Sequence, residues 1–277
     1  MKIIYKLLFL FLLTIGYSSC DFLDIVPDEI TTEADAFKDR NAAKNFVYSC
    51  YGYLPQSNVA SGSLDLLTGD EVITAFEHET FASFPKGNYT ASSPVISYWN
   101  TFFQGLRQCY IFLENVDKVP DLTESVKTDY IAQVKFLIAY YHYQLARCYG
   151  PIILIKELPD VNASQAEYLP RTSYDECVDW ICNLLDEAAS SLPAIRTNKE
   201  DYGLATSVGA KAVKAKMLLY AASPLFNGNS SFYSNFTDKS GSQLMPLTYD
   251  PNKWVKAKTA IKAVSYTHLR AHETRRH

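Results

Sequence analysis

Two pairs of polar residues in the sequence have side chains whose types could carry out catalysis. Asp70 and Glu71 are carboxylates of the kind that glycosidases use, but adjacent residues on one segment point in different directions. His272 and His277 flank a glutamate, as in a zinc protease, yet that motif needs two histidines four residues apart on one helical face, and these are five apart. Neither pair has the spacing that its chemistry needs, and we expect no enzymatic activity.

Between residues 20 and 265, two histidines and five cysteines remain as candidates for acid–base or thiol chemistry. His78 lies between two glutamates, which is typical of a solvated loop, and His142 falls within a helical pattern, where we expect it at the edge of the core or on the surface. The cysteines after residue 20 lie inside apolar helical patterns, where a free thiol is an ordinary small core residue; they are Cys50, Cys109, Cys148, Cys177 and Cys182. We therefore expect no metal site, no cofactor and no disulfide.

Aromatic residues are the strongest compositional signal, with 20 Tyr, 15 Phe and 3 Trp in 277 residues. A tyrosine ring can pack against a core, or it can present a flat face to a ligand while its hydroxyl stays hydrated. Helix seams must take most of these rings. A surplus on loops would indicate a surface for stacking.

Helices must position these side chains, because apolar residues recur every three or four positions along much of the chain. Proline or glycine bounds the helical stretches, and three long polar connections separate some of them. The pattern predicts a mainly α fold of antiparallel, tetratricopeptide-like hairpins with long loop excursions on one side, and irregular helix spacing argues against a strict repeat. The expected helices are residues 33–53, 96–117, 125–149, 174–192 and 205–222, with a further one beginning at 254–264; the polar connections are 56–95, 158–172 and 225–251.

The first 19 residues predict a lipoprotein signal peptide. A basic start is followed by an apolar run, Leu7–Ile15, which is shorter than the roughly 20 residues that span a bilayer. Ser18 and Ser19 then precede Cys20, and small residues directly before a cysteine are the substrate of lipoprotein signal peptidase. We expect a lipidated Cys20 followed by an extended linker, residues 20–32. An ordinary secretory signal with a chance cysteine is the alternative.

The other end of the sequence differs in composition from everything before it. Residues 265–277 hold three of the five histidines and three arginines, and we see no helical or strand period there. We expect a helical domain over residues 33–264 and a non-native tail after it, with a genuine basic tail as the alternative. Without residues 1–19 and 265–277, 21 basic and 29 acidic side chains remain, which argues against nucleic-acid binding.

Several short motifs follow one another in a fixed order along the chain. They are Asp21-Phe22-Leu23-Asp24 after the cysteine, Tyr98-Trp99, the run from Lys135 to Tyr141 that continues to Cys148-Tyr149-Gly150-Pro151, the run from Leu218 to Pro224, and Trp254 to Ala257. Each motif alone is weak, but their order and spacing over residues 20–264 resemble the SusD/RagB family of outer-membrane nutrient-binding lipoproteins. Members of the family are about twice as long, so the resemblance implies that a C-terminal half is missing.

The resemblance implies a role in nutrient uptake at the cell surface. Such proteins cover a TonB-dependent transporter of the SusC kind, capture oligosaccharides or sometimes peptides, and pass them to the barrel. They are binding proteins and not enzymes. Their lipid anchor holds them to the outer membrane, and helix pairs form the scaffold on which long loops carry the ligand site.

Within this half of such a protein, the loop over residues 74–98 is the expected ligand platform. An aromatic ring can stack on the apolar C–H face of a sugar, and amides or carboxylates can bind the hydroxyls at the ring edge. Binding residues concentrate on loops of this kind, and flat aromatic anchors tend to dominate binding energy. The candidates are Phe76, Phe84, Tyr89 and Tyr98 for stacking and Glu77 and Asn88 for hydrogen bonding, whereas Trp99 fits the helix seam and is assigned to the core.

Two other functions remain open at this point. A helical interaction scaffold of the outer membrane would bind a partner protein and no saccharide. A surface glycosidase would turn over a labelled oligosaccharide. Rings on the 74–98 loop could also simply pack the loop against the helices.

Overall fold

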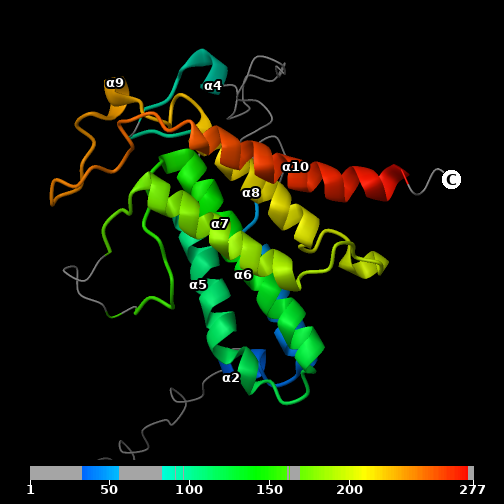
Figure 1. The fold of residues 1–277 in the computed structure, drawn as a ribbon. Coiled ribbons are helices and arrows are strands. Elements are labelled where there is room, and N and C mark those ends of the chain that lie inside the picture. The colour runs from blue at the N-terminus through cyan, green and yellow to red at the C-terminus, as the bar shows by residue number, and fades with distance from the viewer. Residues whose placement is uncertain are drawn as a thin grey trace, which may run out of the picture. The chain divides into compact units, whose positions relative to one another are not determined.

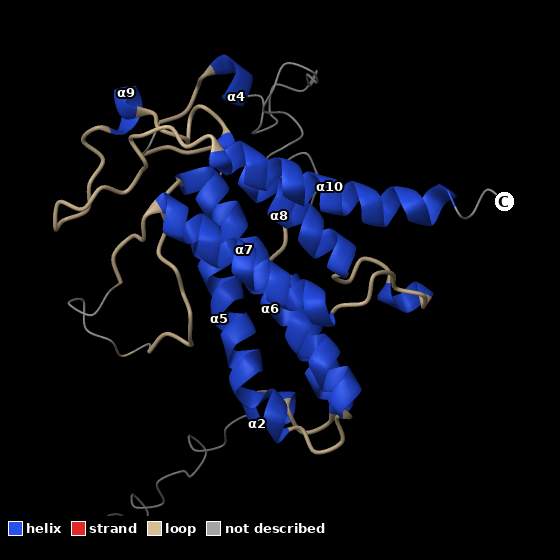
Figure 2. Ribbon diagram, in the orientation of Figure 1, coloured by secondary structure: helices blue, strands red, loops and turns tan. Residues whose placement is uncertain are grey.

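A computed structural model describes residues 33–55, 83–90, 92–95, 97–160, 162 and 169–273. The chain divides after Ala36 into two units, and the helical array lies in the second. Helices and loops make up the described part of the chain (Figure 2). The elements are α2 (Glu33–Ala36), α3 (Arg40–Tyr51), α4 (Ser83–Lys86), α5 (Trp99–Asn115), η4 (Val116–Lys118), α6 (Glu124–Tyr149), α7 (Tyr174–Ser191), η6 (Lys199–Asp201), α8 (Ser207–Ala222), α9 (Ser230–Tyr233) and α10 (Asn252–Glu273).

The long helices of the second unit form a linear array in which each helix packs against the next along the chain. α5 contacts α6, α6 contacts α7, α7 contacts α8 and α8 contacts α10, while α3 lies against both α5 and α6 (Figure 1). The prediction of a mainly helical fold with tetratricopeptide-like pairing is confirmed. Within the described ranges, no helix is both long and apolar enough to cross a bilayer.

The core of the array depends on one close approach between helices. Phe102 of α5 stacks on Tyr141 of α6 with ring centroids 5.6 Å apart, and the Tyr141 hydroxyl donates to the carbonyl of Cys50 in α3. Gly105 makes room for this contact, because a Cβ there would lie 3.1 Å from the Tyr141 ring and 3.0 Å from Tyr53 Cβ. A larger residue at position 105 would therefore require Tyr141 of α6 and Tyr53, just after α3, to shift away from α5.

Most helix boundaries lie within three residues of the predicted ones, and two differences are larger. The helix predicted over residues 33–53 is interrupted, because Asp39 caps a new helix: its Oδ1 accepts from the Ala42 N–H at 2.8 Å. The last helix was predicted to end at Val264 and instead continues to Glu273. No Pro or Gly lies between these two residues, so no residue there breaks the helix. The interpretation of residues 265–277 as a non-native tail stays a prediction.

Candidate functional site

The long connections of the array leave from one end of it, which we call the loop end. The backbone N–H of Tyr98, just before α5, donates to the hydroxyl of Tyr149 at the end of α6 (3.0 Å). Tyr174 at the start of α7 stacks on Phe226 beyond the end of α8, with ring centroids 4.9 Å apart and planes 12° from parallel. The segments around α4 and α9 lie at this end (Figure 1). The antiparallel helices thus gather loops from distant parts of the sequence.

A cluster around Trp99 forms part of this end. The Trp99 ring contacts Tyr149 edge-on at 5.2 Å and Phe103 at 4.9 Å, and the guanidinium of Arg171 lies 5.3 Å from its centroid. Arg171 also donates to the carbonyl oxygens of Tyr149 and Pro151. Trp99 is therefore a half-buried structural ring, close to the predicted core assignment. No sequence pattern indicates the role of Arg171, because only the fold brings it to the indole of Trp99.

The turn that follows α4 brings three of the predicted ligand residues together. The Phe84 and Tyr89 rings lie 5.3 Å apart at 59°, and Tyr89 is 50% exposed. Gly87, with a φ of +68°, closes the turn by donating to the Phe84 carbonyl, and Asn88 donates its backbone N–H to Ser83. The turn therefore presents the half-exposed Tyr89 ring, and the Asn88 side chain is exposed on the same turn.

Tyr98 belongs to a different environment. Its ring stacks on Phe102 at 4.9 Å and 15°, and Phe102 in turn packs on Tyr141. Tyr98 thus extends the aromatic core to the loop end rather than joining Phe84 and Tyr89. The remaining predicted residues, Phe76, Glu77 and Cys20, lie outside the described residues.

His142 is a core residue, and the expectation that it lies at the core edge or on the surface is wrong. It is completely buried, and burial lowers its pKa from 6.5 to about 4. The neutral ring donates from Nδ1 to the Ile138 carbonyl at 2.8 Å and accepts at Nε2 from the Ile155 N–H at 3.1 Å. Trp180 packs edge-on against it at 4.8 Å. The histidine therefore fastens the extended segment after α6 and has no access to a substrate.

The cysteines are poorly suited to thiol chemistry. Cys50, Cys109, Cys177 and Cys182 are buried free thiols. Burial raises the pKa of Cys177 to about 11 and that of Cys182 to about 12, so both remain protonated at neutral pH. In the part of the chain that the structure describes, no three His, Cys, Asp or Glu side chains are grouped to hold a metal ion.

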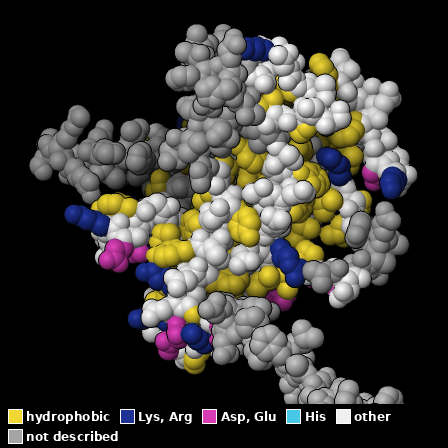
Figure 3. Space-filling view, turned by 180° about the vertical axis from the view of Figure 1, so that it is seen from behind, with side chains coloured by type: hydrophobic (Ala, Val, Ile, Leu, Met, Phe, Trp, Pro, Cys, Tyr) yellow, Lys and Arg dark blue, Asp and Glu magenta, His cyan; other side chains and the backbone are white. Residues whose placement is uncertain are grey.

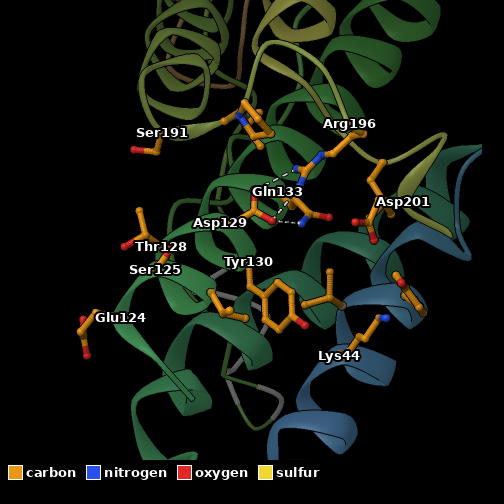
Figure 4. A pocket seen from close by; sticks show the side chains of 16 residues that line it. Lys44, Glu124, Ser125, Thr128, Asp129, Tyr130, Gln133, Ser191, Arg196 and Asp201 are labelled. Carbon is orange, nitrogen blue, oxygen red and sulfur yellow. Dashed lines mark hydrogen bonds and ion pairs between the residues drawn. The ribbon is translucent and has the colours of Figure 1, made fainter. Parts of the chain in front are cut away.

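A groove of about 790 Å³ lies between α3, the start of α6 and the α7–α8 connection (Figure 4). On its floor Arg196 forms two bonds to the Asp129 carboxylate (2.8 and 2.9 Å) and two to the Ala205 carbonyl. Gln133 donates to Asp129 and accepts from the Tyr51 hydroxyl, which accepts from the Ala205 N–H. Because these groups satisfy one another, the network serves to join the α7–α8 connection to α6 and α3.

The surface carries few charges on the face turned away in Figure 1. Figure 3 shows that face: hydrophobic side chains lie among neutral polar ones, and the Lys, Arg, Asp and Glu side chains are scattered. Among the described residues visible on that face, Lys and Arg are not gathered into a cluster of the kind that binds phosphate backbones.

Comparison with known proteins identifies the family. Residues 21–219 match the SusD-like family model described as "Starch-binding associating with outer membrane". The chain belongs to the SusD-like family. Its membership confirms the resemblance drawn from the ordered motifs between the cysteine and the α8 helix.

Individual SusD-like relatives agree with this placement. SusD-like protein P25 of Formosa agariphila is 23% identical over 230 residues, which cover 78% of this chain and 43% of the relative. The solved structure of BT4246 is 33% identical with a TM-score of 0.76, covering 85% of this chain and 41% of that one. A laminarin-binding SusD-like protein is 23% identical with a TM-score of 0.54, covering 67% and 41%, and it supports the fold alone. The chain therefore spans less than half the length of these relatives.

Proposed function

We propose that this SusD-like protein is a lipoprotein of the outer membrane that captures oligosaccharides at the cell surface. It passes them to a TonB-dependent, SusC-like transporter. The observation that carries the proposal is the position of Tyr89, a half-exposed ring on a hydrogen-bonded turn at the loop end. A flat ring in that position can stack on the C–H face of a sugar, and stacking removes both apolar surfaces from water.

The arrangement of the loop end supports capture of an extended ligand. Connections that are far apart in sequence meet there, so one oligosaccharide can contact several of them at once. The helices behind them form a rigid scaffold, which limits the ordering cost of binding. The description of the family as starch-binding favours a glycan. A peptide ligand is the second choice within the same role.

The membrane part of the proposal rests on Cys20. The short apolar run before it and the polar segment after it fit an exported chain that is acylated at this residue. A lipid anchor at Cys20, followed by the linker 20–32, would hold the helical domain beside a barrel in the outer membrane. The transporter is the partner that would receive the ligand.

The test is affinity gel electrophoresis of the full-length protein. Laminarin, amylopectin or xylan is immobilised in the gel, and binding retards the migration of the protein. Replacing both Phe84 and Tyr89 with Ala should weaken retardation by about tenfold, since loss of one good aromatic anchor is worth about 1.4 kcal/mol or more. Tyr202→Ala is the matched control, because Tyr202 is 65% exposed but lies in the α7–α8 connection. Unchanged affinity in the double variant, with an unchanged melting temperature, would remove this turn from the binding site.

Two outcomes would favour the alternative functions. If the wild type binds no saccharide but co-purifies with one defined outer-membrane protein, the chain is an interaction scaffold. If it releases shorter products from a fluorescently labelled oligosaccharide, it is a glycosidase.

A further inference from the structure

The connection between α8 and α10 holds a second set of exposed aromatic rings at the loop end. We call residues Phe226–Asp250 the arm. It is closed at its base by Asn227, which is only 3% exposed. The Asn227 amide donates to the Asp250 carbonyl and accepts from the Asp250 N–H, each at 2.9 Å. Gly228, at a φ of +82°, packs directly against the backbone of Tyr249. The two ends of the arm are therefore fixed to each other.

The inner side of the arm is anchored in the core. Leu244 and Met245 are buried, and the Leu244 carbonyl accepts from the Tyr174 N–H at 2.9 Å. Phe226 stacks on the Tyr174 ring at 4.9 Å. These contacts hold the arm to the start of α7, so it is an ordered part of the fold.

The outer side of the arm carries Phe232, which is 75% exposed. Its ring lies 6.3 Å from that of Tyr233, which lies 6.2 Å from that of Phe236. Further along, the Gln243 amide donates to the Tyr233 carbonyl (2.7 Å), and the Leu244 N–H donates to the Phe236 carbonyl (3.0 Å). The returning segment of the same arm, around Gln243 and Leu244, thus supports this series of rings. Exposing a phenylalanine on an ordered support has no value for folding.

The composition of the arm indicates which ligand such rings would bind. Eleven of its 25 residues are Ser, Thr, Asn or Gln, and only three are charged. Aromatic rings among small hydroxyl and amide side chains supply stacking area together with adaptable hydrogen bonds. A neutral ligand with apolar faces and hydroxyl edges matches this surface, and a charged ligand does not.

We propose that the arm is a second sugar-binding platform, in which Phe232 and Tyr233 stack on a neutral oligosaccharide. The inference rests on the proposed function and extends it, because the turn after α4 and the arm would bind different units of one glycan. Two linked platforms make the second contact intramolecular, so affinity should rise with the length of the glycan.

The experiment compares the full-length wild type with Phe232→Ala, Phe232→Tyr and Tyr202→Ala. Retardation by laminarin, amylopectin and xylan is measured for each, together with calorimetric titration by size-fractionated oligosaccharides of the polysaccharide that retards the wild type. Phe232→Ala should bind the longest oligosaccharide about tenfold more weakly and the shortest ones as the wild type does. Phe232→Tyr and Tyr202→Ala should match the wild type throughout.

The outcomes separate this inference from the function on which it rests. If the wild type is retarded and Phe232→Ala binds every oligosaccharide equally well, the arm is not a sugar platform, and capture by the α4 turn is unaffected. If Phe232→Ala binds sugar normally but no longer co-purifies with the transporter, the arm is a protein interface and again not a sugar platform. If no polysaccharide retards the wild type, the proposed function fails and this inference fails with it.

Discussion

Lowering the pH should destabilise the protein through His142. Its pKa is about 4 in the folded chain and 6.5 when unfolded, so between these values the unfolded chain binds more protons. The contribution of the neutral His142 to stability is therefore fully present above pH 6.5 and is lost as the pH falls towards 4. With these two values, the loss is about 2 kcal/mol at pH 5 and about 3 kcal/mol at pH 4. This is a large share of the 5–15 kcal/mol that typically stabilises a domain.

Urea denaturation of the full-length protein between pH 4.5 and pH 7.5 measures this loss. Carboxylates contribute an acid dependence of their own, so the comparison is with His142→Gln, which does not titrate and can still accept from the Ile155 N–H. The variant should be less stable at pH 7.5, because it loses the ring contact with Trp180. The stability difference between the two proteins should then narrow by about 2 kcal/mol at pH 5. A constant difference across the range would refute the neutral, buried state of the histidine.

Three other changes have definite expected results. Cys20→Ala should move the protein from the membrane fraction to the soluble fraction, and sedimentation with membranes after a high-salt wash would contradict lipidation. Asp129→Asn should lower the free energy of unfolding by about 2–3 kcal/mol, because it leaves Arg196 without its counter-charge and the Arg196 side chain is only 11% exposed. An unchanged midpoint of urea denaturation would contradict this role of the ion pair. Gly228→Ala should cost more than about 2 kcal/mol, since its Cβ would meet the Tyr249 backbone. Gly241 has a similar φ but open space around it, so Gly241→Ala should lower the free energy of unfolding by only about 1 kcal/mol. Thermal melts of both variants measure the difference.

The long helices could be predicted because their apolar spacing reports directly on burial. α6 runs from Glu124 to Tyr149 against a prediction of 125–149, and Gly150 ends it at a φ of +70°. The boundaries that were missed depend on single side chains. Asp39 reads as one polar residue in a helical stretch, and only its bond to Ala42 marks a new start.

The candidate site could be predicted in part. Phe84, Asn88 and Tyr89 do lie on one turn at the loop end, as a polar, aromatic stretch suggests. The ligand role of Tyr98 stays a prediction, whereas the expected position of His142 is wrong, because the residues around His142 are distant from it in sequence. The Tyr98 ring stacks on Phe102, and His142 packs against Trp180 and the segment after α6. A one-dimensional pattern contains no signal for such contacts.

The paired hydrogen bonds between the Asn227 side-chain amide and the Asp250 backbone make the arm a self-contained unit. Its two ends stay together whatever lies between them, so substitutions, insertions or deletions in the stretch from Ser230 to Gln243 need not disturb α8 or α10. Doubling the length of such a loop costs only about 0.6 kcal/mol in closure entropy. Evolution can therefore vary the recognised surface rapidly on an unchanging helical frame, and an arm from another protein could be grafted at the same two residues.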